Sequence, residues 1–324
     1  MVESNNEYAP ILVVVYDRLN HFKKCIESLK SCNEARDSVL YIASDAAYRD
    51  EDLEKVELVR KYVKTIDGFK EVVPIFRSEN VGAVKNINTA SEQIFHRYEN
   101  LIAMEDDVVV GKGFLKFMND GLHVYRDNPK VVAICGYLAP GIESEDGQPF
   151  FLNRFAPYGA ATWRDKERLL DSYRTPGFFD ECFRDFSFFK EYEKISPHCV
   201  RAIPLLIHGG RSFGDIEKGI VMQKNGLLAL YPSSSITKSI GHDNSGLHSK
   251  YNPELQLQAV SDKVYKDLNV KKIENNKHIT LLNSSYRRKD ANFLINYIIY
   301  VFHKYVPNYF IFYSFIRKIY KKLN

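Results

Sequence analysis

The sequence predicts an α/β fold in which a mostly parallel sheet is flanked by helices. The first observation is that short apolar runs alternate with segments of helical period over residues 9–135, a pattern typical of βαβ units. The second is that charged residues follow several of these runs, as expected where parallel strands end at a ligand-binding edge. With 324 residues, 45% of them hydrophobic, the chain is long enough to bury a full core.

Five apolar runs predict the strands of this sheet. They cover residues 9–16, 38–43, 71–76, 101–104 and 130–135. The segments between them predict four helices, the first beginning at an N-cap on Asn20 and the others covering about 51–65, 87–98 and 112–125. In the first helix Phe22, Cys25, Ile26 and Leu29 are spaced i, i+3, i+4, i+7, which places them on one face.

The pattern changes beyond residue 136. Residues 137–262 are irregular and rich in Gly, Pro and aromatic side chains, so we expect them to form the second half of the same domain and to build a binding pocket. Residues 263–324 carry a net charge of +10 against −6 for the rest of the chain, and we expect a basic, aromatic, amphipathic helical tail. A mildly acidic body argues against nucleic-acid binding.

Two interpretations of the tail remain open. Polar residues interrupt its apolar stretch, so it lacks the ~20 consecutive apolar residues of a spanning helix. It lies at a membrane surface, with basic residues 287–289 and 317–318 facing anionic headgroups, or it packs on the body or forms a homodimer face. The polar N-terminus predicts no signal peptide, and five cysteines without a Cys-x-x-Cys pair argue against disulfides and thiolate zinc sites. Both features favour a cytoplasmic protein.

Three consecutive acids, Glu105, Asp106 and Asp107, follow the fourth apolar run. Adjacent carboxylates repel one another, so the pattern indicates either a solvated acidic turn or a cation at the end of the strand. Hard divalent ions such as Mg²⁺ or Mn²⁺ prefer carboxylate oxygens and share them with phosphates. We expect Asp107 to bind the metal, and His242 or His248 to be an additional ligand, with His248 the preferred one.

Further polar residues follow the other predicted strands. For a nucleotide diphosphate bound at this edge, we expect Asp106 to accept from the ribose and Asp45 from the base or ribose. Tyr16 or Arg18 would lie against the base, and Lys85 would reach the phosphates. There is no Gly-x-Gly-x-x-Gly after the first run and no P-loop motif, which argues against a dinucleotide or Walker-type site.

A transfer to a hydroxyl group also needs a general base outside the metal cluster. Asp215 is the best candidate because it follows Phe213-Gly214 in an aromatic, glycine-rich segment. Asp185 and Glu217 are weaker candidates, since their surroundings indicate ordinary amphipathic helix.

Several of these segments together resemble the GT-A fold glycosyltransferases. They are Pro10–Arg18, Glu79–Gly82 with Asn86, Met104–Val108, Phe155–Arg164 and Ile240–His248. The order is similar to bacterial family 2-like sugar transferases and to the N-acetylglucosaminyltransferase I group, in which Glu-Asp-Asp serves as the Asp-x-Asp motif. The resemblance covers about residues 8–250 and implies that Asp107 binds Mn²⁺ or Mg²⁺, Asp106 the ribose and Asp45 the nucleoside. It places the base at Asp215, although Phe-Gly stands where the family often has Trp.

This resemblance implies a metal-dependent, inverting hexosyl- or N-acetylhexosaminyltransferase with a UDP-sugar donor and a glycan or lipid-linked acceptor of bacterial surface polysaccharide. Residues 1–136 would bind the nucleotide-sugar, and residues 137–262 would form the acceptor-binding and catalytic half. The enzyme would be cytoplasmic and peripheral at the inner face of the cell membrane. The alternatives are a sugar-nucleotide nucleotidyltransferase and a non-catalytic glycan-binding protein.

Overall fold

The computed structural model describes residues 8–245, 251–268, 270 and 292–314. The chain divides into two compact units, each described by itself. Unit 1 contains residues 1–152, 156–168 and 228–274, and unit 2 contains residues 153–155, 169–227 and 275–324.

Unit 1 is built on an eight-stranded sheet in the order β3-β2-β1-β4-β8-β6-β9-β7. The strands are β1 (Ile11–Val15), β2 (Val39–Ser44), β3 (Glu71–Phe76), β4 (Asn100–Glu105), β6 (Val131–Cys135), β7 (Phe150–Leu152), β8 (Ala160–Trp163) and β9 (Leu228–Tyr231). Strands β3, β2, β1 and β4 are mutually parallel, as are β6 and β9, whereas β8 and β7 run antiparallel to their neighbours. The predicted α/β class with a mostly parallel sheet is confirmed.

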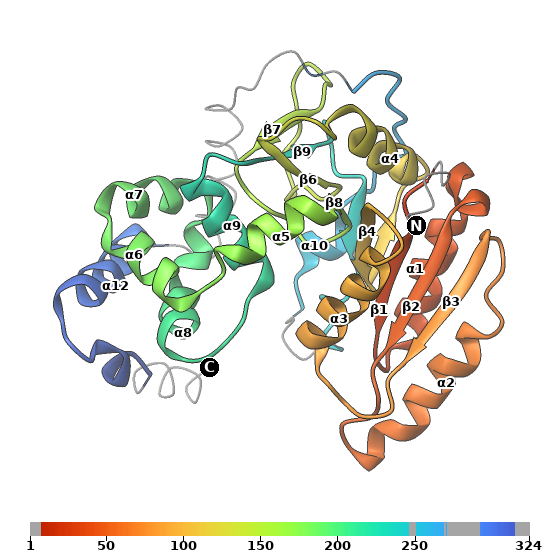
Figure 1. Cartoon of the computed structure of the whole chain (residues 1–324), viewed down its shortest axis with the longest axis horizontal. Helices are drawn as coiled ribbons and strands as arrows, with labels where there is room; N and C mark the ends of the chain where they lie inside the picture. The colour runs from red at the N-terminus through yellow and green to blue at the C-terminus, as the bar shows by residue number, and fades with distance from the viewer. Residues whose placement is uncertain (1–7, 246–250, 269, 271–291, 315–324) are drawn as a thin grey trace. The chain divides into compact units, whose positions relative to one another are not determined.

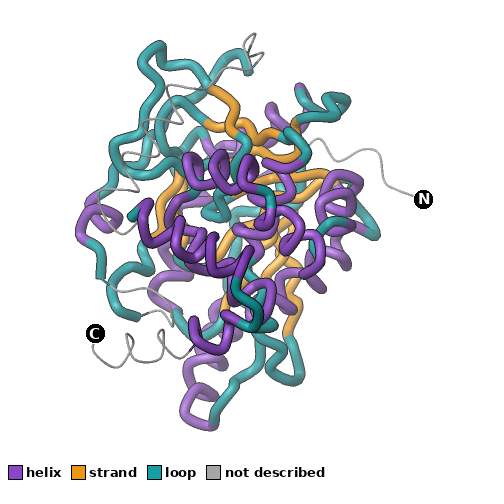
Figure 2. Tube along the Cα trace, turned by 90° about the vertical axis from the view of Figure 1, so that its left-hand side faces the viewer, coloured by secondary structure: helices purple, strands orange, loops and turns teal. Residues whose placement is uncertain are grey.

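Helices pack against both faces of this sheet; Figure 2 draws helices in purple and strands in orange. The helices are α1 (Leu19–Lys30), α2 (Leu53–Val63), α3 (Ala83–Phe95), α4 (Phe114–Val124) and α5 (Arg164–Ser172), the last of which continues into unit 2. Side chains of β1 alternate between the faces: Ile11 and Val13 pack with α1, α2 and α4, whereas Leu12 packs with α3. The predicted face of α1, from Phe22 to Leu29, is fully buried.

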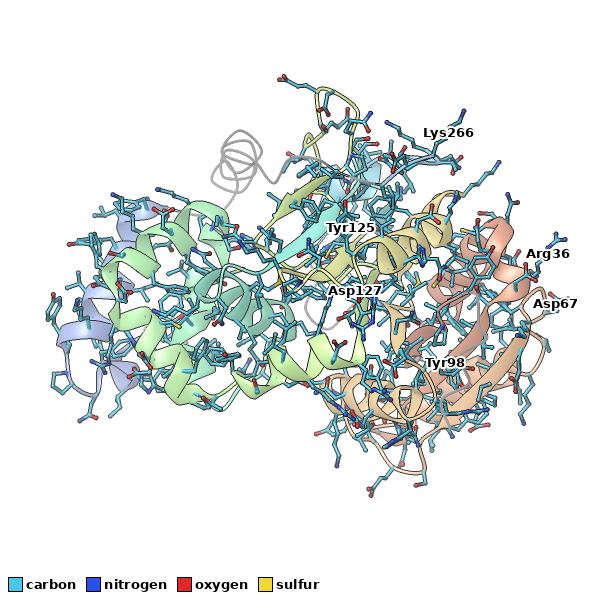
Figure 3. All side chains as sticks on the ribbon, turned by 45° about the horizontal axis from the view of Figure 1, so that its top comes forward. Arg36, Asp67, Tyr98, Tyr125, Asp127 and Lys266 are labelled. Carbon is cyan, nitrogen blue, oxygen red and sulfur yellow. The ribbon has the colours of Figure 1, made fainter. Side chains whose placement is uncertain are left out.

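Shorter elements complete unit 1. They are the 3₁₀ turns η1 (Asn33–Asp37) and η2 (Asp50–Asp52), the helix α10 (Pro253–Leu257), and a two-stranded antiparallel ribbon of β5 (Val108–Val110) and β10 (Thr237–Ser239). The segment after α10 packs on the body of unit 1, because Tyr125, labelled in Figure 3, donates its hydroxyl to the carbonyl of Leu268 and accepts from the amide of Val270. Tyr265 and Leu268 are buried.

The described residues of unit 2 form helices joined by turns and loops, without a strand. It contains α6 (Pro176–Arg184), α7 (Phe186–Ile195), the 3₁₀ turn η3 (Pro197–Ala202), α8 (Ile203–His208), α9 (Gly214–Lys224) and α12 (Phe293–Tyr305). Helix α12 contacts α6, α7 and η3. The ring of Tyr300 stacks on Phe189 with centroids 4.6 Å apart, and the buried amide of Asn296 donates to the carbonyl of Pro197 at 2.9 Å.

One prediction needs correction, and two others stay predictions. The first helix begins at Leu19 with Arg18 at its N-cap, so the predicted N-cap at Asn20 is wrong. Within the predicted tail, residues 263–268 belong to unit 1 and α12 to unit 2; the tail over 263–324 stays a prediction, because most of it lies outside the described residues. The division into 1–136 and 137–262 was drawn by function and stays a prediction; the sheet itself continues into β7, β8 and β9.

Candidate functional site at the carboxyl edge of the sheet

The carboxyl ends of β2, β1 and β4 are neighbours in the sheet. Val15 is in register with Ser44, and Val14 with Glu105, so the residues that follow these strands meet at one edge. This is the place where α/β sheets bind ligands. The predicted convergence of polar residues at this edge is present: the guanidinium of Arg18 contacts both Asp106 and Asp107.

Arg18 bridges the two aspartates from the N-cap of α1. Its Nη2 lies 2.5 Å from Oδ1 of Asp106, and its Nη1 lies 2.9 Å from Oδ2 of Asp107. Desolvation raises the pKa of the Asp106 carboxyl to about 6, although Arg18 acts in the opposite direction. The sequence predicted that Tyr16 or Arg18 lies against a nucleoside base, which stays a prediction. In the structure the charge of Arg18 lies against the carboxylates, where it offsets part of their repulsion.

Asp107 has the open coordination that a cation site needs. Its side chain is buried, and its Oδ1 has no hydrogen-bond partner among the described residues. A buried carboxylate oxygen without a partner is costly, and divalent cations prefer such oxygens. The residues present therefore fit a divalent metal ion.

The loop after β10 holds Asp107 in place. The amide of Ile240 donates to the carbonyl of Asp107 at 2.7 Å. A Cβ on Gly241 would lie 2.0 Å from Oδ2 of Asp107 and 2.8 Å from Nη1 of Arg18. Only glycine allows the backbone to approach the carboxylate this closely. Sequence reasoning missed Gly241, and the signal that could have found it is its place directly before His242 in a loop of small residues.

Of the two candidate histidines, only His242 lies within the described residues. Desolvation lowers the pKa of its imidazole, and the nearby charge of Asp107 acts in the opposite direction. Its ring packs edge-on against Tyr158. His248, the preferred ligand in the sequence prediction, lies outside the described residues, so its role stays a prediction.

Asp45, directly after β2, holds a neighbouring loop. Its Oδ1 accepts from the amides of Ala46 and Val81 at 2.9 and 3.0 Å, and its Oδ2 accepts from the amide of Gly82 at 2.8 Å. Gly82 has a φ of 80° at the N-cap of α3, a left-handed conformation that favours glycine. A carboxylate offers about four acceptor positions, so one remains for the predicted contact with a nucleoside.

The motif residues around Gly82 brace the same loop. Asn80 donates to the carbonyl of Ala46 at 2.7 Å. The buried side chain of Asn86 donates to the carbonyl of Ala43 at 3.0 Å and accepts from Arg77 at 2.9 Å. The segment from Glu79 to Asn86 thus fixes how the carboxyl end of β2 meets α3.

Tyr16 and Lys85 are the remaining predicted donor-binding residues. The hydroxyl of Tyr16 donates to Asp52 at 2.9 Å and accepts from the amide of Tyr48 at 2.8 Å, so it fastens the loop after Asp45. Lys85 is exposed in the first turn of α3. Their contacts with a nucleotide stay predictions.

Asp215, the predicted base, lies in the first turn of α9 in unit 2. Its side chain reaches solvent, yet desolvation by the surrounding protein raises the pKa of its carboxyl, while the amide of Ile216 and the charge of Arg154 lower it. Arg154 donates to the carbonyl of Ile195 at 3.2 Å. A carboxylate with a raised pKa is a stronger proton acceptor than an ordinary surface acid.

The two weaker candidates have structural partners. Oε1 of Glu217 accepts from the hydroxyl of Ser212 and the amide of Phe213, both at 2.7 Å. Its Oε2 lies 2.7 Å from Nη2 of Arg174. Asp185 caps α7 by accepting from the amide of Ser187 at 2.9 Å. Glu217 and Asp185 each have an ion-pair partner, Arg174 and Lys224 respectively, whereas Asp215 has no ion-pair partner among the described residues.

No protein-family model and no curated protein matches the chain. The solved structures that are similar to parts of it include the following three. A mannosyltransferase from Pyrobaculum calidifontis, PcManGT in complex with GDP-Man and Mn²⁺, is 14% identical with a TM-score of 0.40, covering 69% of this chain and 71% of that one. TarS of S. aureus is 13% identical with a TM-score of 0.35, and the match covers 47% of this chain and 28% of that one. The 1–349 fragment of TarS is 13% identical with a TM-score of 0.38, and the match covers 67% of this chain and 71% of that one. Likenesses at these scores carry no argument about function, which we take from the residues of the site.

Proposed function

We propose that the chain is a metal-dependent glycosyltransferase that uses a nucleotide-sugar donor, with UDP as the nucleotide. The observation that carries the proposal is the buried, unpartnered Oδ1 of Asp107 at the carboxyl edge of a parallel sheet. Mn²⁺ or Mg²⁺ bound there would stabilise the negative charge that develops on the diphosphate leaving group.

The protein residues at this edge bind and orient the donor. Asp107 holds the cation, and Asp106 accepts from the ribose. Arg18 keeps the two carboxylates together before the donor arrives, because its guanidinium contacts both. The loop held by Asp45 forms the nucleoside side of the site, with Tyr16 and Lys85 as further donor-binding residues. His248 is the additional metal ligand in this proposal, and His242 is its alternative.

The second part of the proposal concerns the acceptor. Asp215 removes the proton from the acceptor hydroxyl, which then attacks the anomeric carbon and inverts its configuration. Its raised pKa and the structural engagement of Glu217 and Asp185 support this role. The transferred sugar is a hexose or N-acetylhexosamine, and the acceptor is a glycan or lipid-linked glycan of bacterial surface polysaccharide.

Two other functions remain in competition. A sugar-nucleotide nucleotidyltransferase is expected to carry a glycine-rich basic loop after its first strand. Here α1 begins at Leu19, four residues after β1 ends at Val15, and the residues between them are Tyr16, Asp17 and Arg18. A non-catalytic glycan-binding protein has no need for a buried pair of aspartates bridged by an arginine.

Membrane association at the cytoplasmic face is also a proposal. No helix in the described part of the chain is long and apolar enough to span a bilayer. Helix α12 nevertheless exposes Leu294 and Ile298 beside its buried face. An exposed apolar face suits the membrane interface, where a lipid-linked acceptor would be found; a second copy in a homodimer would cover the same face. Co-sedimentation with anionic liposomes and light scattering separate these two cases.

Incubation with a panel of nucleotide-sugars tests the proposed function. We expect Mn²⁺-dependent release of nucleotide from one UDP-sugar, and loss of this release in Asp107→Asn. Asp120→Asn on α4 is the matched control, because it removes an acid that pairs only with Lys116 four residues earlier. Neither hydrolysis nor a thermal shift with any member of the panel would contradict the proposal.

A further inference from the structure

Unit 2 contains a second group of metal-ligating side chains, unrelated to the carboxyl edge of the sheet. Asp180 of α6, His208 at the end of α8 and His303 of α12 each bring one ligand atom within 4.8 Å of the others. The three residues are more than twenty positions apart in the sequence and lie on three different helices. Nothing in the proposed sugar transfer uses these residues.

The atoms that face one another in this cluster lack hydrogen-bond partners. The imidazole of His303 is 3% exposed, and its Nε2 has no hydrogen-bond partner among the described residues. The same holds for Oδ1 of Asp180, although the two atoms are only 3.2 Å apart. The two atoms form an ion pair when the imidazole is protonated, whereas a divalent cation between the neutral imidazole and the carboxylate would satisfy both atoms.

The spacing of these atoms fits a tetrahedral ion. Zinc binds His nitrogen and Asp oxygen at about 2.0–2.2 Å, so two of its tetrahedral ligands lie about 3.3 Å apart. The 3.2 Å between His303 and Asp180 is close to this value. His208 is exposed, so its side chain can turn toward the ion, and solvent can supply the fourth ligand.

Neighbouring residues orient the ligands in the way metal sites require. Nδ1 of His303 lies 2.9 Å from the hydroxyl of Tyr309. That oxygen can accept a hydrogen bond from the Nδ1–H group, which fixes the tautomer that leaves the lone pair of Nε2 free. Nε of Arg184 donates to Oδ2 of Asp180 at 2.8 Å, so Oδ1 remains for the ion.

We propose that Asp180, His208 and His303 form a structural site for a divalent transition metal of the zinc class, which joins α12 to α6 and α8. Metal binding would fix the C-terminal helix on unit 2, because the ion is shared by three helices. The two nitrogen ligands and one carboxylate favour Zn²⁺ over Mg²⁺ or Ca²⁺, which prefer oxygen ligands alone.

The test uses the full chain after removal of metal by a chelator, with Zn²⁺ as the probe. The experiment is done in the Asp107→Ala variant, which lacks the carboxylate at the sheet edge. Zinc bound at that edge then does not add to the number of zinc ions measured per chain. We expect one Zn²⁺ per chain and a raised melting temperature. Co²⁺ in place of Zn²⁺ should give the visible absorption of tetrahedral cobalt.

The deciding variant is His208→Ala, which removes an exposed ligand whose ring lies beside those of Tyr309 and Phe310, so its melting temperature without metal is measured first. Loss of one ligand should weaken Zn²⁺ binding by at least about 100-fold, because loss of even an outer partner costs about 10- to 100-fold. Asp180→Asn should do the same. His123→Ala, which removes another exposed histidine, is the matched control and should leave binding unchanged. The proposal would be overturned if the Asp107→Ala variant bound no Zn²⁺, or if adding His208→Ala left its Zn²⁺ affinity unchanged. His303 and Asp180 would then form an ion pair without a metal.

Discussion

Gly241→Ala tests the geometry of the carboxyl edge without changing any charge. The added Cβ would lie 2.0 Å from Oδ2 of Asp107, whereas ordinary contact begins at 3.4 Å. Either the carboxylate or the loop must therefore move by about 1.4 Å. The loop is fixed by the hydrogen bond from Ile240 to the carbonyl of Asp107, and the carboxylate by its ion pair with Arg18. Both ways of relieving the clash disturb the site.

The size of this movement sets the expected effect. Metal–ligand distances tolerate changes of about 0.2 Å, so the displaced carboxylate no longer holds the ion. We expect Mn²⁺-dependent affinity for UDP, measured by calorimetry, to fall at least tenfold, which corresponds to about 1.4 kcal/mol. Overpacking at the same position should lower the free energy of unfolding in urea by about 1–3 kcal/mol.

Gly177→Ala is the matched control. A Cβ at this exposed position on α6 meets nothing within 4 Å, and alanine is preferred to glycine in a helix. Stability should be unchanged or slightly higher, and UDP affinity should equal that of the wild type. If Gly241→Ala also bound UDP and Mn²⁺ as the wild type does, the close approach of this loop to Asp107 would be irrelevant to donor binding.

Three further predictions concern other residues. Asp215→Asn should retain UDP binding but lose transfer. In the wild type, the transfer rate should fall as the pH decreases through a midpoint above 3.8, because protonation of a carboxyl with a raised pKa removes the base. A midpoint at or below 3.8 would contradict this role. Asp45→Ala should cost about 2–4 kcal/mol in urea unfolding, because three backbone amides lose their acceptor, and an unchanged midpoint would refute that estimate. Glu217→Gln should lower the free energy of unfolding by about 2 kcal/mol, because it weakens the charged hydrogen bond to Arg174. UDP affinity should stay the same, and a loss of affinity would assign Glu217 a role in binding.

Much of the fold could be predicted because local patterns decide it. The alternation of apolar runs and helical faces up to residue 135 gave five strands and four helices, and α1 buries the expected face from Phe22 to Leu29. Strands β7, β8 and β9 were missed because they are only three or four residues long. Runs this short carry too little periodicity to be distinguished from loops.

The acidic residues of the candidate site could be predicted from the sequence, but the contacts that other residues make with them could not. Three adjacent carboxylates after an apolar run indicate a cation, which made Asp107 recognisable. The contact of Arg18 with both aspartates and the approach of Gly241 depend on tertiary structure that brings residues more than eighty positions apart together. The metal cluster of unit 2 escaped prediction for the same reason, since Asp180, His208 and His303 share no local motif.

The central claim is that Asp107 holds a cation that binds a nucleotide diphosphate. Calorimetric titration of UDP into the wild type and Asp107→Asn, each with and without Mn²⁺, tests it most directly. We predict UDP binding to the wild type that strengthens at least tenfold when Mn²⁺ is added, and no such gain in Asp107→Asn. Equal UDP affinity in all four titrations, or no binding in any of them, would contradict the claim.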